Sequence, residues 1–161
     1  MKIIVISDTH GNDDRYSAVL RTEGEPDMLI HCGDTCGSDE YYRNSLSCPV
    51  VIVRGNNDYA FGIDKEALLT VGTHRIFVTH GHGEGVYFGK SRLSYKAASL
   101  GADIVLFGHT HVPYNEYDEV NKVHLLNPGS LSYPRQYNGK PSYMVLEIGE
   151  NKELQISLKY C

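Results

Sequence analysis

Short runs of aliphatic residues recur along this chain, and the first five of them each stop at a cluster of glycine and polar residues. Runs of this length bounded by Gly, Asn, Asp and Pro are typical of β-strands. The early runs are apolar throughout, as strands buried on both faces are. The expected strands are Lys2–Ser7, Asp27–His31, Val50–Arg54, Arg75–Thr79, Asp103–Phe107, Lys122–Leu126, Ser142–Ile148 and Glu153–Lys159.

Two segments between these strands have the spacing of amphipathic helices. The first is Asp13–Thr22, for which Asn12 or Asp13 is the N-cap candidate. The second is Ser91–Leu100, which is followed by Gly101, a natural helix stop. The last two strands alternate better than the others, which predicts a half-exposed antiparallel pair, and Asn138-Gly139 before them predicts a tight turn. The inward-facing helix residues are expected to be Tyr16, Val19, Leu20, Leu93, Ala97 and Leu100.

The alternation of strands and helices predicts an α/β layered sandwich around a mixed sheet. A chain of 161 residues, 41% of them hydrophobic, is long enough for one globular domain, expected over residues 1–161. The longest apolar runs have four residues, whereas a membrane span needs roughly 18. The polar stretch Ser7–His10 also leaves no room for the apolar part of a signal peptide. We therefore expect no membrane contact and a cytoplasmic location.

Charge and cysteine content narrow the function further. A formal net charge of −5 argues against an extended nucleic-acid surface, although a bound metal could attract a small phosphate ester locally. The cysteines form no C-x-x-C pair and frame no loops evenly, so reduced thiols are expected rather than disulfides. The four cysteines are Cys32, Cys36, Cys48 and Cys161.

The polar clusters after the first five strands carry carboxylate, amide and imidazole groups. Each cluster alone is a common turn sequence. In open α/β sheets, however, ligands bind beyond the carboxyl ends of the strands, so five such clusters predict one shared site. The clusters are Asp8–Asn12, Gly33–Asp34, Gly55–Asp58, His80–Gly83 and Gly108–His111.

The residue types in these clusters indicate metal binding. Two aspartates, one asparagine and four histidines are too many donors for one tetrahedral zinc site, and the absence of a thiolate argues against structural zinc. Mixed carboxylate and imidazole donors suit a pair of divalent ions such as Mn²⁺, Fe²⁺ or Zn²⁺. Two such ions need a shared anionic ligand and can then clamp a phosphoryl group, and Asp34 is the candidate bridge.

The same motifs, in this order, resemble the calcineurin-like metallophosphoesterase superfamily, and more narrowly its small, cap-less bacterial and archaeal phosphodiesterases. The resemblance runs from Met1 to about Arg135 and includes Asn127–Ser130. It implies a four-layer αββα sandwich with two mixed β-sheets. It also implies hydrolysis of small phosphodiesters, with a metal-bridging hydroxide attacking phosphorus in line at a dinuclear centre.

The resemblance further implies a distribution of the ligands over two metal ions. Mn²⁺ is the first expectation for both, with Fe²⁺, Zn²⁺ or Ni²⁺ as alternatives. Asp8, His10 and His111 would hold one ion, Asn56, His80 and His109 the other, and Asp34 would bridge them.

The chain departs from the superfamily pattern at Asn57. Many members have a histidine there that assists the leaving group, and a neutral amide cannot donate a proton as a general acid. Loss of that help typically costs about 10²–10⁴-fold in rate, so we expect preference for esters with good leaving groups, or proton donation by His82 or by a metal-bound water. The expected catalytic residues are Asp34, Asn57 and His82.

Several other residues have more than one interpretation. Arg135 binds the phosphate or pairs with a surface carboxylate, and His82 contacts substrate or is a solvated loop residue. His31 is expected in the core. Strand-edge positions are expected for His74 and His124, packing roles for Cys32 and Cys36, and loop positions that could form an aryl-stacking wall for Tyr59, Tyr87, Tyr114 and Tyr133.

Two alternatives to a phosphodiesterase stay open. The fold also resembles the vacuolar sorting subunit of retromer, a protein-binding scaffold, although a scaffold has no need of seven intact metal donors. The other alternative is a phosphomonoesterase or protein phosphatase. Asn57 and the small size of the chain argue against it. The short connection from Asn56 to His80 leaves little room for a cap domain. The expected partner is a small phosphodiester, and a homodimer is allowed for without any surface being indicated.

Overall fold

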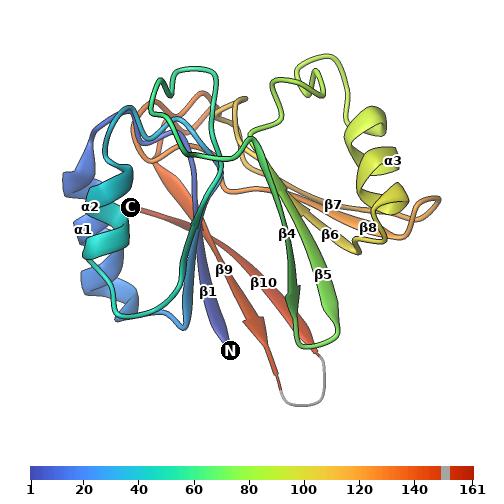
Figure 1. Ribbon diagram of the computed structural model, residues 1–161, viewed down its shortest axis with the longest axis horizontal. Coiled ribbons are helices and arrows are strands. Elements are labelled where there is room, and N and C mark those ends of the chain that lie inside the picture. The colour runs from blue at the N-terminus through green and yellow to red at the C-terminus, as the bar shows by residue number, and fades with distance from the viewer. Residues whose placement is uncertain (150–152) are drawn as a thin grey trace.

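The computed structural model describes residues 1–149 and 153–161. Two five-stranded sheets are stacked face to face, with two helices outside one sheet and a third helix outside the other (Figure 1). The predicted four-layer αββα sandwich with two mixed sheets is confirmed. The elements are β1 (Lys2–Ile6), α1 (Asp13–Glu23), β2 (Met28–His31), α2 (Asp39–Asn44), β3 (Val50–Ile52), β4 (Glu66–Val71), β5 (His74–Thr79), α3 (Ser91–Ser99), β6 (Ile104–Leu106), β7 (Tyr114–Asp118), β8 (Val123–Asn127), β9 (Ser142–Ile148) and β10 (Leu154–Tyr160).

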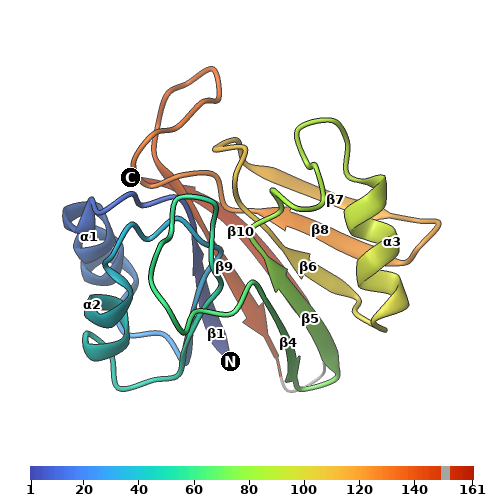
Figure 2. The same ribbon diagram turned by 45° about the horizontal axis from the view of Figure 1, so that its top comes forward.

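Each sheet has a parallel centre and antiparallel additions. In the first sheet, ordered β10-β9-β1-β2-β3, the strands β1, β2 and β3 are parallel. In the second, ordered β4-β5-β6-β8-β7, the strands β5, β6 and β8 are parallel. The loops that follow β1, β2, β3, β5 and β6 therefore meet at one end of the sandwich, the upper end in Figure 1 and nearer the viewer in Figure 2.

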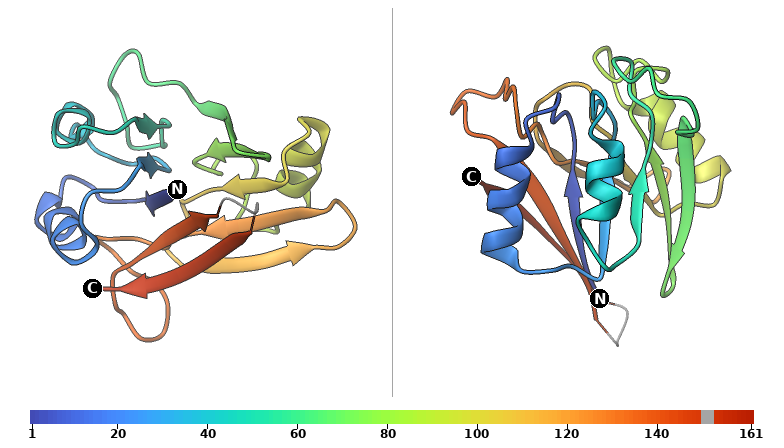
Figure 3. Two further views of the ribbon diagram at one scale, coloured as in Figure 1. Left: turned by 90° about the horizontal axis from the view of Figure 1, so that it is seen from below. Right: turned by 60° about the vertical axis from the view of Figure 1, so that its left-hand side comes forward.

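The sheet strands are apolar throughout because both of their faces are covered. Along β1, Ile3 and Val5 lie between the two sheets, whereas Ile4 and Ile6 face α1 and α2. All four side chains are fully buried, which for residues of this size stabilises the fold by roughly 1.5–3 kcal/mol each. Figure 3 shows α1 and α2 side by side over the outer face of this sheet.

The two predicted helices form with the expected inward faces. Tyr16 and Val19 of α1 are buried against the first sheet, and Leu93 and Ala97 of α3 against the second. Asn12 stands at the N-cap of α1 but makes no side-chain capping bond. After α3, Gly101 takes a φ of +70° and its N–H bonds the Ala98 carbonyl at 2.9 Å, as expected for a helix stop.

Three elements were not predicted from the sequence, namely β4, α2 and β7. The first and last are edge strands, and each exposes much of its length to solvent, so neither forms an apolar run. The third is a six-residue helix that buries only Tyr42. Tyr114 was expected in a loop, but it begins β7 and its hydroxyl donates to Glu116 Oε2 at 2.5 Å.

The prediction of a half-exposed final strand pair is correct only for β10. The strand β9 pairs with β10 on one side and with β1 on the other, and all but one of its residues are buried. It is therefore a central strand covered on both faces, and only β10 is at an edge. The expected turn at Asn138-Gly139 is confirmed, because Gly139 has a φ of +60° and its N–H bonds the Gln136 carbonyl at 3.0 Å.

All four cysteines carry free thiols, as expected. Cys32 lies in the core between the two sheets, but Cys36 is exposed beside the site described below, so its expected packing role is wrong. In the part of the chain that the structure describes, no helix has the length and apolar character that crossing a membrane requires.

Candidate metal centre

The seven predicted metal ligands lie on the loops at the upper end of the sandwich. The first sheet supplies four of them from the ends of β1, β2 and β3, and the second sheet supplies three from the ends of β5 and β6. The site therefore straddles the junction of the two sheets. The ligands from the first sheet are Asp8, His10, Asp34 and Asn56, and those from the second are His80, His109 and His111.

Two glycines allow these loops to approach one another. A Cβ on Gly108 would overlap Ser7 Oγ and lie 2.7 Å from Asp8 Oδ2, and a Cβ on Gly55 would overlap the carboxylate of Asp34. Only a residue without a side chain fits at either place. Gly55 thus lets the loops after β2 and β3 of the first sheet meet, and Gly108 brings the loop after β6 of the second sheet against Asp8 of the first.

The backbone at the site takes a conformation that side-chain-bearing residues rarely adopt. Five of the predicted ligands have left-handed φ values between +46° and +69°. Such residues cost on the order of 1–3 kcal/mol each and cluster at functional sites, where the surrounding structure holds them in place. The five are Asp8, His10, Asp34, His109 and His111.

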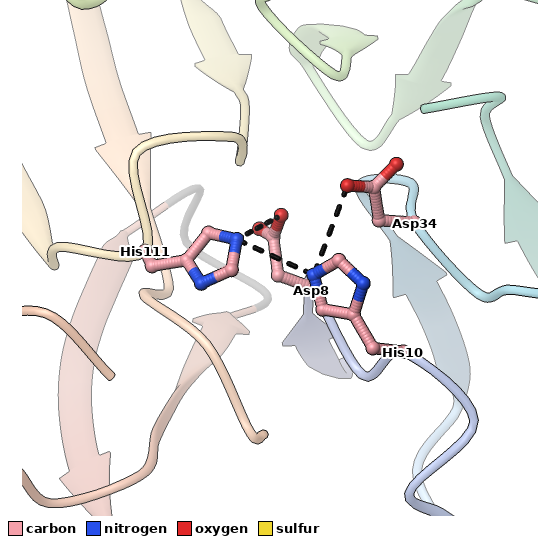
Figure 4. Close-up of side chains that lie close together, drawn as sticks. All are labelled: Asp8, His10, Asp34 and His111. Atoms are coloured by element: carbon pink, nitrogen blue, oxygen red, sulfur yellow. Dashed lines mark hydrogen bonds and ion pairs between the residues drawn. The ribbon is translucent and has the colours of Figure 1, made fainter. Parts of the chain in front are cut away.

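Asp8, His10, Asp34 and His111 form one compact cluster (Figure 4). One ligand atom from each of them lies within 4.8 Å of all the others. His111 Nε2 is 3.2 Å from Asp8 Oδ1 and 3.4 Å from His10 Nε2, and His10 Nε2 is 3.8 Å from Asp34 Oδ2. Nitrogen and oxygen atoms that can share a cation thus face a common point.

The ring of His111 is oriented by a backbone carbonyl. Its Nδ1 lies 2.7 Å from the Tyr133 carbonyl oxygen, which can only accept, so Nδ1 carries a proton and Nε2 is turned toward the site. Nε2 lies 3.2 Å from Asp8 Oδ1, a buried oxygen without a hydrogen-bond partner. A cation between the two would satisfy both atoms, so these residues fit a metal ion.

His80 anchors a second group of donors in the same way. Its Nδ1 donates to the Cys32 carbonyl at 2.7 Å, and its Nε2 is turned toward the site, 3.1 Å from Asn56 Oδ1 and 3.5 Å from Asp34 Oδ2. Burial lowers the pKa of His80, but Asp34 and Asp8 outweigh burial and raise it. The His109 ring lies beside the His80 ring, with ring centroids 5.1 Å apart. Burial and the neighbouring His80 lower the pKa of His109 to about 4, so this imidazole is neutral and free to act as a ligand at pH 7.

Asp34 lies between the two groups. Its Oδ2 is 3.8 Å from His10 Nε2 on one side and 3.5 Å from His80 Nε2 on the other. Burial alone raises the pKa of this carboxyl, but His80 and the hydrogen bonds of Asn57 outweigh burial and hold the pKa well below its usual range. At Asp8, likewise, His111 and His80 outweigh burial and lower the pKa. Both carboxylates are therefore ionised near neutral pH.

Asn57 is bound to Asp34 rather than free in the cleft. Its backbone N–H donates to Asp34 Oδ1 at 2.8 Å and its side-chain amide donates to Oδ2 at 2.7 Å. The geometry therefore places Asn57 as a positioning residue for the central carboxylate.

Asp58, which the sequence indicated only as part of a turn, is a buried aspartate that organises the loops. Asp58 Oδ2 accepts from the N–H groups of Asp34 and Gly55, both at 2.8 Å. Its Oδ1 accepts from Thr35 Oγ1 at 3.0 Å and Cys36 N at 2.8 Å. Its position three residues after a glycine turn is the available signal, because aspartate side chains bond loop N–H groups.

The Asn127–Ser130 motif supports the site from behind. Ser130 Oγ donates to the Asp8 carbonyl at 2.7 Å, and Asn127 Nδ2 donates to the Gly108 carbonyl at 2.8 Å. Ser7 Oγ donates to Asp8 Oδ2 at 2.6 Å, a contact that the sequence analysis also missed. These bonds fix two of the three loops that carry the first cluster, those after β1 and β6.

Arg135 and His82 lie at the mouth of the site. Arg135 N–H bonds the His111 carbonyl at 3.0 Å, its guanidinium donates to the Tyr87 hydroxyl, and no carboxylate among residues 1–149 and 153–161 pairs with it. The Tyr87 hydroxyl donates in turn to the His109 carbonyl at 3.1 Å. His82 is exposed, with its ring centroid 5.4 Å from that of His80.

The remaining histidines lie where the sequence predicted. His31 is fully buried beneath the site, with its ring nitrogens bonded to Thr9 Oγ1 and Gly33 N. His74 begins β5 and contacts Asp103 Oδ2 at 2.6 Å. His124 is the second residue of β8, and its ring packs against that of Tyr117 in β7.

Comparison with known proteins agrees with this geometry. The family model of the calcineurin-like phosphoesterase superfamily domain matches residues 1–151 of the chain. The chain belongs to this superfamily. It is therefore a metallophosphoesterase, a hydrolase of a metal-dependent family, and the clustered ligands give it a candidate metal site.

Individual members of the superfamily are similar along nearly the whole chain. A Bacillus subtilis protein named probable metallophosphoesterase YsnB is 37% identical over 149 residues, which cover 92% of this chain and 85% of the relative. A novel archaeal phosphodiesterase of known structure is 26% identical with a TM-score of 0.73, over 99% of this chain and 100% of the other. Vps29 of Entamoeba histolytica, solved with Zn²⁺, shares the fold with a TM-score of 0.77 at 24% identity, over 99% of both chains.

Proposed function

We propose that the protein is a phosphodiesterase that acts on small phosphodiesters with two divalent cations, Mn²⁺ first among them. Asp8, His10 and His111 would hold one cation, and Asn56, His80 and His109 the other. The observation that carries the proposal is the place of Asp34, whose Oδ2 lies 3.8 Å from His10 Nε2 and 3.5 Å from His80 Nε2. A carboxylate oxygen shared in this way suits a bridging ligand.

The cations, when bound, would supply an activated water as the in-line nucleophile and would neutralise charge on the phosphoryl oxygens. The chain's own residues set the conditions for this chemistry. The carboxylates of Asp8 and Asp34 are ionised near pH 7, and the bonds from Nδ1 of His80 and His111 to backbone carbonyls turn Nε2 of each ring toward the cations. The left-handed backbone holds the donors in place before any ligand arrives, which reduces the reorganisation that binding requires.

The expected preference for esters with good leaving groups rests on Asn57 and its neighbours. An amide that donates to Asp34 offers no proton to a departing alkoxide, so esters whose leaving groups are stable anions are favoured. His82 is the remaining imidazole at the mouth, and burial beside His80 lowers its pKa. It is therefore mostly neutral at pH 7 and provides a weak proton source. The archaeal relative is named a phosphodiesterase, which supports diesters over monoesters as the substrate.

The competing function is that of a protein-binding scaffold, as the shared fold with Vps29 suggests. A scaffold gains nothing from a strained backbone and a buried carboxylate oxygen without a partner, and both features favour the enzyme. We also propose a cytoplasmic location, because four free thiols suit a reducing compartment.

The test compares hydrolysis of bis-p-nitrophenyl phosphate with that of p-nitrophenyl phosphate by metal-stripped protein, with and without added Mn²⁺. We expect metal-dependent cleavage that favours the diester and is lost in Asp34→Asn and His80→Ala. Asp14→Asn, at an exposed aspartate of α1, is the matched control and should retain full activity. Preference for the monoester would replace the proposal by a phosphomonoesterase. Absence of cleavage in folded, metal-binding protein would favour the scaffold.

A further inference from the structure

A cleft of about 490 Å³ opens directly beside the first ligand cluster. It is built from the loops after β1, β2 and β3, so it lies on the first-sheet side of the candidate metal centre. His10 is both a wall of this cleft and a member of the cluster, and Asn57 separates the cleft from Asp34. The lining residues are His10, Cys36, Gly37, Asn57, Tyr59 and Ala60.

The chemistry of this lining excludes a charged occupant. None of the six residues is a lysine, arginine, aspartate or glutamate, so the cleft offers no partner for a second phosphate or for an ammonium group. What it offers is the phenol ring of Tyr59, the imidazole of His10, a methyl group, a thiol and an amide. An occupant that matches these groups is organic, uncharged and flat.

The structure selects Tyr59 among the tyrosines near the motifs. Tyr87, Tyr114 and Tyr133 are all engaged within the protein, through hydrogen bonds or ring contacts to their neighbours. By contrast, in the described part of the chain the Tyr59 ring packs against no other ring and its hydroxyl has no hydrogen bond. Its side chain is 88% exposed at the rim of the cleft. The fold makes no use of this ring, so it is free to stack on a ligand.

We propose that this cleft binds the flat, uncharged organic group of a phosphodiester, an aryl group or a nucleoside base, which stacks on the ring of Tyr59. This proposal rests on the proposed function, because the phosphoryl group would lie at the metal centre while one of its ester groups enters the cleft. The substrate class is thereby narrowed to diesters with at least one aromatic ester group. A dialkyl diester leaves Tyr59 without a partner.

Two phosphonates that differ only in the organic group test this directly. Phenylphosphonate and methylphosphonate share the anionic head, so the ratio of their dissociation constants on Mn²⁺-loaded protein isolates the contribution of the ring. Isothermal titration calorimetry measures both. We expect Tyr59→Ala to weaken phenylphosphonate binding by about fivefold or more, as loss of a stacking residue does, and methylphosphonate by less than about twofold. Tyr59→Phe keeps a ring and should keep the preference.

Tyr95→Ala is the matched control, because Tyr95 is 71% exposed on α3, on the other side of the molecule. An unchanged phenyl-to-methyl ratio in Tyr59→Ala, or an equal loss in Tyr95→Ala, would overturn the proposal. The same holds if Tyr59→Phe loses the preference. If methyl p-nitrophenyl phosphate is cleaved and the ratio stays unchanged, only this inference fails. If neither phosphonate binds and no diester is cleaved, the proposed function fails with it.

Discussion

At the scale of single residues, the site depends on side chains that hold the ligands from behind. Asp58 is the clearest example, since its two carboxylate oxygens collect four hydrogen bonds from the loops that carry Asp34 and Gly55. The carboxylate of Asp58 faces these four donors, which would otherwise lie inside the protein without a hydrogen-bond partner. Residues of this kind decide ligand geometry without touching a metal or a substrate.

Asp58→Asn therefore tests positioning separately from ligation. In the variant, an amide nitrogen would face N–H groups that now donate to a carboxylate oxygen. We therefore expect the free energy of unfolding to fall by about 2–4 kcal/mol. Metal affinity should fall by about 10–100-fold, as for other partners of metal ligands. Urea unfolding and competition with a chelator measure the two effects. Asp14→Asn serves as the control, and unchanged metal affinity in Asp58→Asn would refute the positioning role.

His31 gives a pH dependence with a definite sign. Gly33 N–H donates to its Nδ1 at 3.1 Å and burial lowers its pKa from 6.5 to about 4, so the folded protein holds this ring neutral. The unfolded chain binds a proton there at higher pH, so stability is full above about pH 6.5 and falls as pH drops toward 4, by up to ~3 kcal/mol. Titration of the imidazole C–H resonances by NMR should give a midpoint near 4. A midpoint near 6.5 would contradict the buried, neutral state.

At the scale of elements, α1 is tied to the far edge of its sheet by one carboxylate. Glu23, the last residue of α1, accepts from Tyr143 Oη of β9 at 2.7 Å and from Lys159 Nζ of β10 at 2.8 Å. Burial raises the pKa of Glu23, but the hydrogen bonds from Lys159 and Tyr143 outweigh burial and lower it. The ionised form therefore holds three elements together.

Glu23→Gln should loosen this junction only when the wild-type carboxylate is charged. The pKa of Glu23 is lowered in the folded protein. The stabilisation by its carboxylate is therefore fully present above the ordinary glutamate pKa near 4.5 and is lost as the pH falls through the lowered pKa. We expect a loss of about 1 kcal/mol in unfolding free energy at pH 7 and a smaller loss at pH 3. Urea unfolding at both pH values checks this, with the exposed Glu40→Gln as control. An equal loss of unfolding free energy at pH 7 and pH 3 would mean that Glu23 contributes through packing and not through its charge.

The elements also show which parts of the fold a single sequence reveals. Strands covered on both faces, such as β1, form continuous apolar runs and were predicted within a residue or two. The edge strands β4 and β7 expose one face, and no such run marks them. The site was predictable because its ligands directly follow buried strands. Asp58 and Ser130 were not, because their roles depend on hydrogen bonds across loops that are distant in sequence.

At the scale of the whole molecule, the candidate metal centre lies where the two sheets of the sandwich meet. The first sheet brings Asp8, His10, Asp34 and Asn56, and the second brings three histidines. Carboxylates of the first sheet and imidazoles of the second lie close together across the junction, with His111 Nε2 3.2 Å from Asp8 Oδ1 and His80 Nε2 3.5 Å from Asp34 Oδ2. A cation that binds only the assembled donors must stabilise the packing of one sheet against the other.

Metal binding should consequently raise the thermal stability of the protein. At a free Mn²⁺ concentration 100 times the dissociation constant, linkage adds about 2.7 kcal/mol to the free energy of unfolding, and more at higher concentration. Thermal unfolding of chelator-treated protein with and without Mn²⁺ measures the increment. Asp34→Asn should lose most of it because the shared ligand is gone. Gly108→Ala should lose it too, because a Cβ there overlaps Ser7 Oγ and pushes the loops of the two sheets apart.

The decisive comparison is between these variants and Asp14→Asn, which leaves the junction intact and should keep the full increment. Calorimetric titration with Mn²⁺ establishes independently whether each variant binds the ion. A wild-type protein that binds Mn²⁺ without any rise in Tm would place the ion on a site that exists equally in the unfolded chain. Such a result is incompatible with donors collected from two sheets, since those donors come together only when the sandwich is assembled.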